Sequence, residues 1–323
     1  MHAFFEARRD ARTRDSTIGP YHTVLIYNPV AGKLRGEGCA RLERAVRSLE
    51  QQDYRISVTP TTGPGTAGEL ARQAIERGAG LILAAGGDGT LNEVVQGMVN
   101  SEIPLGILPA GTANVLASEM GIGKDLKHAA DRLAECVPRR IGLGRLDFPE
   151  ASRHYVCMAG VGFDAHIVYN LTASLKNSLG KVAYWISGLG QATRLLPQFE
   201  VEIDGARHAC SFALISRVRN YGGDFEIARS TTLFDDSFEV ILFQGRLSLR
   251  YLKYLGAMIM GRMTGIRGVT FLRAQKIRLS QASDQRVYIQ VDGEYAGRLP
   301  ASIEFVPAAL TLLMPPEYRS SGH

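Results

Sequence analysis

The stretch GGDGT at residues 86–90 combines three glycines with one carboxylate, a combination that could do chemistry on a phosphate. Glycines let backbone amides approach a ligand closely, because no Cβ lies in the way. The preceding residues, Leu81–Ala85, are apolar, and the following ones have the spacing of one helix face: Leu91, Val94, Val95 and Met98. A helix that begins at such a turn points its free N–H groups at the turn, which suits an anion.

The carboxylate of Asp88 does not suit a phosphate site unless a divalent cation lies between the two groups, or the acid orients something else. An acid inside a phosphate-binding turn therefore indicates Mg²⁺ and phosphoryl transfer. An ordinary Gly-Asp-Gly turn between a strand and a helix is the alternative that these residues leave open. The patterns of a P-loop and of a dinucleotide-binding fingerprint are both absent.

Two further turns carry acids. Asp235 and Asp236 precede an apolar strand, where ordinary turn chemistry explains them about as well as metal binding does. Asp292 and Gly293 are a hairpin signal, and Glu294 follows them directly. On spacing alone, Glu294 is either a turn residue or a carboxylate that is presented to a substrate.

A strand, a turn and a helix recur four times in the first part of the chain. The strands are predicted at 23–27, 54–58, 81–85 and 104–108. We expect Thr66 to cap the helix after the second strand, with Glu69 completing a capping box. The alternation predicts a parallel α/β sheet with ligand loops at the carboxyl ends of its strands.

Strands dominate after residue 155. They are predicted at 155–158, 199–203, 210–216, 238–243, 276–279 and 287–291, with two helical insertions near 167–196 and 247–264. The composition suits two domains of a soluble globular protein, with 323 residues, 45% of them apolar, 21% charged and a net charge of +5. The four cysteines form no Cys-x-x-Cys pair, which indicates a reducing cytosol rather than a zinc site or a disulfide framework. No run of 18 apolar residues and no apolar signal core are present.

The charge is unevenly distributed along the second half. No acid lies between Asp164 and Glu200 or between Glu239 and Asp284. The second of these stretches contains the basic residues Arg246, Arg250, Lys253, Arg262, Arg267, Arg273, Lys276 and Arg278. Aromatic and large apolar residues are interleaved with them: Tyr184, Trp185, Tyr251, Tyr254, Met258, Ile259 and Met260. This bias suits an anionic membrane surface, whereas no motif supports nucleic acid; a solvated basic face is the alternative.

GGDGTLNEVVQG resembles the nucleotide-binding loop of the diacylglycerol kinase catalytic-domain family, which includes bacterial lipid kinases and sphingosine and ceramide kinases. NPVAGK at 28–33, Thr61 and LGILPAGTAN at 105–114 occur in the order and at roughly the spacing of that family. VDGEYAG at 291–297 is similar to its C-terminal motif, and the resemblance covers roughly residues 22–316. It implies a Rossmann-like parallel α/β domain, then a β-rich β-sandwich domain, with the active site in the interdomain cleft.

The resemblance also implies roles for individual residues. ATP would be bound by Asn28, Lys33, Thr61, Gly86, Gly87, Asp88, Gly89, Thr90, Asn92, Glu93, Gly111, Thr112 and Asn114. Asp88 would position Mg²⁺, and Glu294 would accept the proton of the lipid hydroxyl. A structural Mg²⁺ would be held by the side chain of Asp236 and the backbone of Leu233 and Phe238. Three positions depart from the family pattern, with Ser237 in place of glycine and Val115 and Gly142 in place of aspartates that many relatives carry.

We therefore predict an ATP-dependent phosphotransferase of phospholipid biosynthesis, with a diacylglycerol-type acceptor favoured over a sphingoid base or ceramide. NAD kinases share GGDGT but lack the VDGEYAG arrangement, and a non-catalytic nucleotide sensor at a membrane is the third hypothesis. The predicted parts are a disordered tail (1–20), a nucleotide-binding domain (21–140) to which residues 308–317 return, and a lipid-binding domain (141–307). We expect a cytoplasmic protein at the inner face of the membrane that binds no nucleic acid, and we leave a homodimer open.

Overall fold

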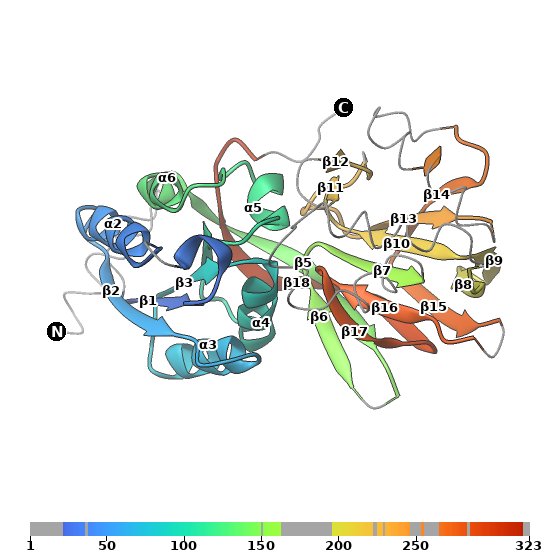
Figure 1. Ribbon diagram of the computed structural model, residues 1–323, viewed down its shortest axis with the longest axis horizontal. Coiled ribbons are helices and arrows are strands. Elements are labelled where there is room, and N and C mark those ends of the chain that lie inside the picture. The colour runs from blue at the N-terminus through green and yellow to red at the C-terminus, as the bar shows by residue number, and fades with distance from the viewer. Residues whose placement is uncertain are drawn as a thin grey trace.

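The computed structural model describes residues 22–35, 38–149, 151–162, 196–221, 225–228, 230–245, 253–254, 265–282 and 285–318 (Figure 1). The predicted tail 1–20 and nearly all of the two predicted insertions lie outside these residues. The described chain forms an α/β half and a β half, which lie side by side in Figure 1.

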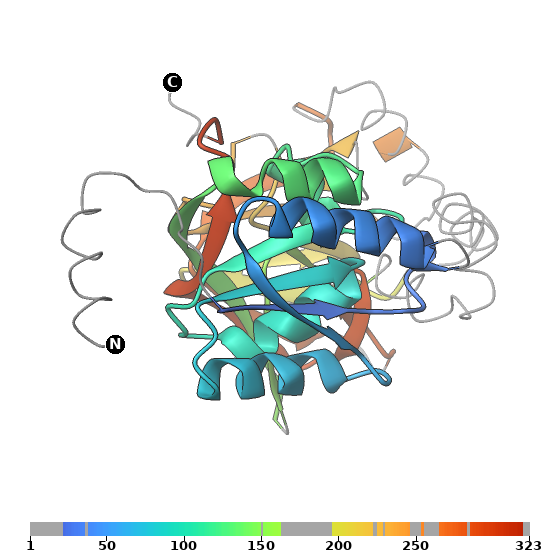
Figure 2. The same cartoon turned by 90° about the vertical axis from the view of Figure 1, so that its left-hand side faces the viewer.

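The first half is a parallel sheet with helices on both faces, as Figure 2 shows along the sheet. Its strands are ordered β2-β1-β3-β4, with bounds β1 (His22–Tyr27), β2 (Arg55–Pro60), β3 (Leu81–Gly86) and β4 (Leu105–Pro109). The helical elements are η1 (Gly32–Leu34), α2 (Gly38–Glu50), α3 (Thr66–Glu76), α4 (Asp88–Met98), α5 (Val115–Glu119), α6 (Leu126–Asp131) and η2 (Leu133–Glu135). Every residue of β3 and β4 is buried, because helices cover both faces of these central strands.

The second half is made of antiparallel strands in two packed layers. Its strands are β5 (Val137–Asp147), β6 (Ser152–Tyr155), β7 (Met158–Gly162), β8 (Phe199–Ile203), β9 (Ala206–Cys210), β10 (Phe212–Ser216), β11 (Asn220–Tyr221), β12 (Phe225–Glu226), β13 (Phe238–Phe243), β14 (Val269–Ala274), β15 (Lys276–Gln281), β16 (Tyr288–Val291), β17 (Glu294–Arg298) and β18 (Ala301–Met314). One layer has the order β14-β13-β10-β7-β16-β17, and the other is built from β15, β8 and β9 beside β18. Buried side chains of both layers, among them Phe199, Phe238 and Ile289, form the core between them.

The long strand β18 joins the two halves. Its first part pairs antiparallel with β15, and Leu312 near its end pairs in parallel with Leu105 of β4. Strand β5 pairs antiparallel with β18 along both parts, and the register of this pairing shifts between Val306 and Leu310. The last strand therefore extends the sheet of the first half into the second, which fixes how the loops of the two halves face each other.

The predicted fold class, an N-terminal parallel α/β domain followed by a β-sandwich domain, is confirmed. Two strand predictions were wrong in detail, because apolar runs continue through turns. Residues 155–158 span the turn between β6 and β7, and residues 210–216 span the end of β9 and all of β10. The predicted cap of α3 was also wrong, since Thr66 is its first helical residue and Gly65 is the N-cap.

Candidate functional site

Two glycine turns lie back to back at the carboxyl ends of β3 and β4. A Cβ on Gly111 would stand 2.4 Å from the Cα of Gly87, so the close approach requires glycine. Asn114 holds the second turn, because its side chain accepts a hydrogen bond from the Gly111 N–H at 2.9 Å and donates one to the Gly111 carbonyl at 2.8 Å. The turns present backbone rather than side chains at the start of α4, which suits a phosphate.

Several of the predicted nucleotide-binding side chains are used to hold the loops together. The Asn28 amide donates to Thr90 Oγ1 at 3.1 Å and accepts from the Val30 N–H at 3.0 Å. Glu93 accepts hydrogen bonds from the N–H groups of Gly65 and Ala67, at 2.8 and 3.2 Å, and so caps α3 from the neighbouring helix. These side chains shape the loops, whereas the backbone of the glycine turns is the part that a nucleotide can approach.

Lys33, Thr61 and Thr112 lie at the rim of the same loops and are partly or fully exposed. The Lys33 N–H donates to the Ala110 carbonyl at 2.9 Å, which joins η1 to the second glycine turn, and its ammonium donates to the Lys124 carbonyl. Burial lowers the pKa of Lys33, and the charge of Asp125 offsets part of this effect. A partly desolvated ammonium beside the glycine turns is suited to an anionic ligand.

Asp88 is the first residue of α4 and faces the start of α5. Its Oδ1 accepts a hydrogen bond from the Val115 N–H at 2.7 Å. Burial, together with the nearby charge of Asp292, raises the pKa of Asp88 to about 6, and the hydrogen bond from the Val115 N–H offsets part of this rise. Asp88 is therefore a carboxylate whose ionisation costs free energy, as expected for an acid that has a charged partner during function.

Asp292 ties the two halves together at this point. Its carboxylate accepts hydrogen bonds from the N–H groups of Val156, Cys157 and Met158, at 2.9–3.0 Å, and from the amide of Asn92 in α4 at 2.9 Å. Desolvation raises its pKa, against these donors. The carboxylate of the β16–β17 turn thus holds both the connection between β6 and β7 and the helix of the GGDGT motif.

Glu294 begins β17 and lies against the start of α4. A Cβ on Gly89 would stand 2.2 Å from Glu294 Oε1, so the glycine allows the carboxylate to approach. Arg153 of β6 donates to Glu294 Oε2 at 3.2 Å and to Asn92 Oδ1 at 2.9 Å. The Glu294 side chain is 44% exposed, so that a substrate can reach it. The structure therefore brings Asp88 and Glu294, 206 positions apart in the chain, to the same end of α4.

Sequence reasoning assigned no role to Arg153 and treated Asp292 only as a hairpin residue. The hairpin itself was predicted correctly, because Asp292 and Gly293 have φ values of 48° and 84° and connect β16 to β17. The bonds of Asp292 join residues more than 130 positions apart. No local signal could have indicated them; a buried-strand pattern that ends in an acid was the one available hint.

Replacing Asp292 by asparagine is expected to destabilise the protein by on the order of 2–4 kcal/mol and to lower kcat. Asparagine tolerates the left-handed φ, but its NH₂ group faces N–H donors that need an acceptor. Urea unfolding and steady-state kinetics would measure the two effects. As a control, Asp204→Asn changes an exposed acid with a φ of 50° and should alter neither. Wild-type stability in Asp292→Asn would contradict the role of Asp292 as a tie between the halves.

The structure gives a physical reason for one departure from the family pattern and none for valine at 115. The Val115 N–H donates to Asp88 Oδ1, a backbone hydrogen bond that an aspartate at 115 could make equally. A Cβ on Gly142 would stand 2.3 Å from the ring of Phe305, so β5 has no room for an aspartate there. Ser237 is not among the described non-glycine residues with positive φ, and the turn at 237 therefore does not require glycine.

Of the predicted metal ligands, Leu233 and Asp236 lie in the turn before β13, and Phe238 is the first residue of that strand. The Asp236 side chain is exposed, and its carbonyl accepts a hydrogen bond from Gln275 at 3.0 Å. Asp235 is paired with Arg273 at 2.9 Å. The Leu233 carbonyl accepts a hydrogen bond from the buried Arg217 at 2.8 Å. In the described part of the chain, no cluster of three or more His, Cys, Asp or Glu side chains is placed to hold a metal ion.

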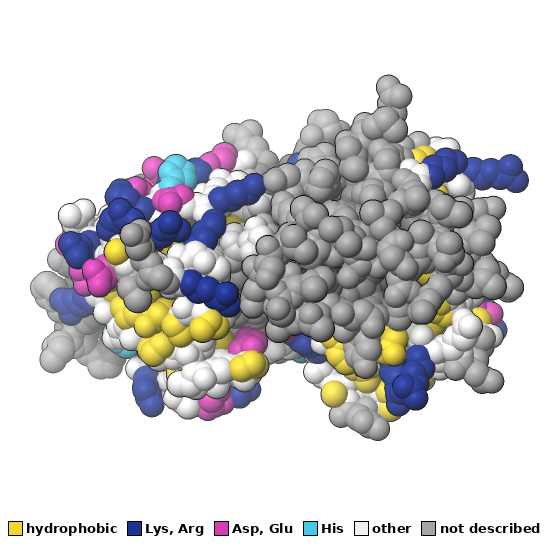
Figure 3. All heavy atoms as spheres, viewed as in Figure 1, with side chains coloured by type: hydrophobic (Ala, Val, Ile, Leu, Met, Phe, Trp, Pro, Cys, Tyr) yellow, Lys and Arg dark blue, Asp and Glu magenta, His cyan; other side chains and the backbone are white. Residues whose placement is uncertain are grey.

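Acids from other strands lie beside the end of the basic stretch 246–278. Lys276 pairs with Glu304 at 2.8 Å and Arg278 lies 3.7 Å from Glu202, because acids on β18 and β8 face β15. Arg246, Arg250, Tyr251, Met258, Ile259, Met260 and Arg262 lie outside the described residues, as do Tyr184 and Trp185. On the face in Figure 3, Lys and Arg side chains also lie over α2 and α6, with Asp and Glu side chains among them. Exposed basic charge is therefore not confined to the stretches that the sequence singled out.

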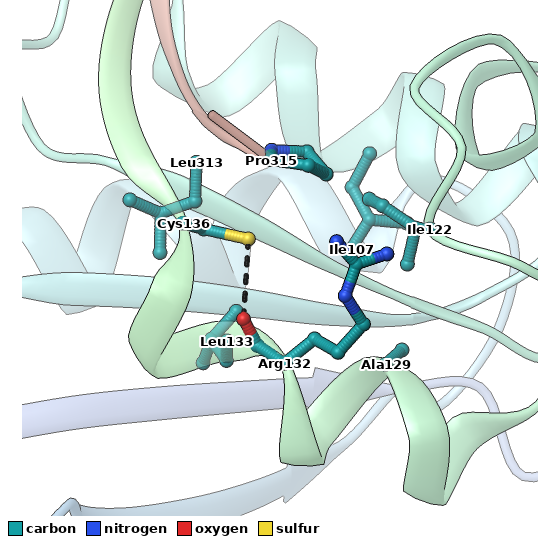
Figure 4. A pocket seen from close by; sticks show the side chains of 8 residues that line it. All are labelled: Ile107, Ile122, Ala129, Arg132, Leu133, Cys136, Leu313 and Pro315. Atoms are coloured by element: carbon teal, nitrogen blue, oxygen red, sulfur yellow. Dashed lines mark hydrogen bonds between the residues drawn. The ribbon is translucent and has the colours of Figure 1, made fainter. Parts of the chain in front are cut away.

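A small pocket lies between β4, α6 and the end of β18 (Figure 4). It is lined mainly by apolar side chains, with Arg132 at its side and Cys136 donating to the Arg132 carbonyl at 3.5 Å. Its volume of about 10 Å³ corresponds to roughly one water molecule, so it is no lipid site. Among the described helices, none has the length and apolar character needed to cross a bilayer.

Comparisons with known proteins identify relatives of both halves of the chain. Residues 22–146 match the model of the diacylglycerol kinase catalytic domain, and residues 157–314 match that of the YegS C-terminal NAD kinase beta sandwich-like domain. The diacylglycerol kinase of Bacillus subtilis is 28% identical over 91% of this chain and 96% of its own length. A diacylglycerol kinase of Staphylococcus aureus is 29% identical over 86% of this chain and 87% of its own length.

A solved structure of a diacylglycerol kinase from Bacillus anthracis has the same fold. It superposes with a TM-score of 0.74 at 20% identity, over 92% of this chain and 98% of that one.

Proposed function

We propose that this chain, which belongs to the diacylglycerol kinase catalytic-domain family and is a lipid kinase, phosphorylates a diacylglycerol-type hydroxyl at the start of α4. The observation that supports this site is the contact of the exposed Glu294 carboxylate with Gly89 of the GGDGT turn. A proton acceptor and a phosphate-binding turn thereby meet at one point, as transfer of a phosphoryl group to a hydroxyl requires.

Glu294 orients the acceptor hydroxyl and takes its proton as the oxygen attacks the γ-phosphate, and ADP leaves as the bond from its bridging oxygen to the γ-phosphorus breaks. Such general base assistance is worth typically about 10²–10⁴ in rate. Arg153 holds one carboxylate oxygen at 3.2 Å and leaves the other, which faces Gly89, available to the hydroxyl. Arg153 also binds Asn92 of α4, so the proton acceptor and the phosphate-binding helix move as one unit.

ATP is the phosphate donor in this proposal. The backbone of the two glycine turns approaches its phosphates, and the ammonium of Lys33 supplies a positive charge at the rim of the loops. Asp88 fits a role in holding Mg²⁺, since its enclosed carboxylate has a raised pKa and its Oδ1 is already oriented by Val115. Mg²⁺ bound there with the nucleotide would neutralise charge on the phosphate oxygens.

The lipid must be taken from a membrane surface, so we infer peripheral attachment to an anionic bilayer on the cytoplasmic side. The exposed Arg41 and Arg44 of α2 support this, because anionic lipids attract such charge. Lys253, in the second stretch without acids, is exposed as well.

One experiment separates this proposal from its alternatives. The purified protein is incubated with labelled ATP, Mg²⁺ and either diacylglycerol, monoacylglycerol, sphingosine, ceramide or NAD. We expect labelled phosphate on diacylglycerol, with Glu294→Gln as the matched control that binds ATP without transfer. Transfer to sphingosine or ceramide alone would reassign the acceptor, and transfer to NAD would reject the lipid site. Binding of ATP without any transfer would favour the nucleotide sensor.

A further inference from the structure

A positively charged side chain is buried beside the turn before β13. Arg217 follows β10 directly and has no exposed surface. Its Nη2 donates to the Leu233 carbonyl at 2.8 Å, and its Nη1 lies 3.4 Å from the Asp235 carbonyl. The ring of Phe305 lies below the guanidinium, with 4.8 Å between Cζ and the ring centroid. The charge is thus met by carbonyl oxygens and an aromatic face, which both attract cations.

Arg217 keeps its charge in this environment. Burial lowers the pKa of Arg217 to about 10, which is still well above neutral pH. Within the described residues, no carboxylate forms an ion pair with it, and its Nε has no hydrogen-bond partner. The carbonyls of the turn are therefore the main acceptors for the buried guanidinium. The guanidinium needs these acceptors, and the carbonyls need its N–H donors.

The same turn is less suited to a metal ion than to the guanidinium. Mg²⁺ needs near-octahedral oxygen ligands at about 2.0–2.1 Å. The Leu233 carbonyl, one of the expected ligands, already accepts a hydrogen bond from the guanidinium. A divalent cation at that oxygen would lie close to a buried positive charge, where little water screens the repulsion. The neighbouring acid Asp235 pairs with Arg273 at 2.9 Å and accepts a hydrogen bond from Thr232 at 2.8 Å.

The other side of the Leu233 peptide is also held by side chains of this chain. The Leu233 N–H donates to the Tyr318 hydroxyl at 3.1 Å, and that hydroxyl donates to Glu119 Oε1 at 3.1 Å. Glu119 is the last residue of α5, whose first residue, Val115, donates its N–H to Asp88. The turn is thus connected through α5 to the GGDGT loop.

We infer that the guanidinium of Arg217 replaces the structural metal ion of the turn at 233–238, so that this protein needs no divalent cation there. Arg217 supplies the positive charge that the Leu233 and Asp235 carbonyls face, and it is built into the chain rather than taken from solution. The inference concerns the stability of the second domain and holds for any lipid acceptor, so its test is independent of the proposed activity.

Thermal unfolding without nucleotide tests the inference on the full chain. The melting temperatures of wild type and Asp236→Asn are compared in EDTA and in millimolar Mg²⁺. A structural site filled far above its Kd would raise the Tm by roughly 5 °C or more. We expect any effect of Mg²⁺ to be the same in both proteins, because Asp236 is an exposed acid that binds no metal. A rise in wild type that Asp236→Asn abolishes would overturn the inference.

A second pair of variants tests the arginine directly. Arg217→Met keeps most of the apolar stem but leaves the two carbonyls without a donor, and we expect the Tm to fall by roughly 5–10 °C in EDTA and in Mg²⁺ alike. Arg273→Met is the matched control, since Arg273 pairs with the same turn but is 45% exposed. We expect it to cost far less. An Arg217→Met protein as stable as wild type would contradict the inference, and failure of this variant alone to fold would support it.

Discussion

Replacing Asp88 by asparagine is expected to lower kcat at least about 100-fold and to make the folded protein more stable. The rate loss follows from removing a charge that organises the phosphate site, which is worth about 10²–10³ in comparable enclosed sites. The turn itself should survive, because the asparagine oxygen can still accept the hydrogen bond from the Val115 N–H. Steady-state kinetics and urea unfolding on the same preparation would measure both effects.

The gain in stability has a definite dependence on pH. The pKa of Asp88 rises from 3.8 in the unfolded chain to about 6 in the folded protein. Between these values the folded state binds more protons, so the contribution of Asp88 to stability falls as the pH rises, and the deficit is complete above about pH 6. Asparagine never ionises. The free energy of unfolding of the variant should therefore exceed that of wild type by up to about 3 kcal/mol at pH 7.5 and by little at pH 4.

The pH dependence of activity should also report the ionisation of Asp88. If the ionised form of Asp88 is required, wild-type kcat/KM for ATP falls as the pH drops below about 6. The exposed control Asp204→Asn should leave both profiles unchanged. Near wild-type turnover in Asp88→Asn, or an equal difference in stability at both pH values, would exclude Asp88 from the proposed role.

The sequence predicted the local parts of this site well. Strand β3, the glycine turn and α4 follow from an apolar run, a break and a helical spacing, all within 18 residues. The β16–β17 turn follows from Asp-Gly, because aspartate and glycine are among the residues that tolerate a positive φ at adjacent positions. These features depend on backbone conformation, which neighbouring residues determine.

The unpredicted parts depend on contacts between distant segments. Strand β5 was missed because its glycines and arginines resemble a turn, and it becomes a strand by pairing along β18. The stretch without acids was interpreted as suited to an anionic membrane surface, yet Glu202 and Glu304 face it from other strands. Gly89 was assigned to the approach of a phosphate, and in the structure it also admits the carboxylate of Glu294. Local composition carries none of this information.

Replacing Glu294 by glutamine is expected to lower kcat by about 10²–10⁴ while leaving the affinity for ATP nearly unchanged. The amide can orient the lipid hydroxyl but cannot take its proton, and Glu294 approaches α4 without belonging to the glycine turns.

Gly89→Ala offers an independent test, since its Cβ would stand 2.2 Å from Glu294 Oε1 and displace the carboxylate. Alanine favours a helix more than glycine does, so this variant should lose turnover without losing stability. Isothermal titration with an ATP analogue, kcat on dispersed diacylglycerol and the Tm separate these effects. Normal turnover in both Glu294→Gln and Gly89→Ala would exclude Glu294 as the proton acceptor and leave it only a structural role in the turn.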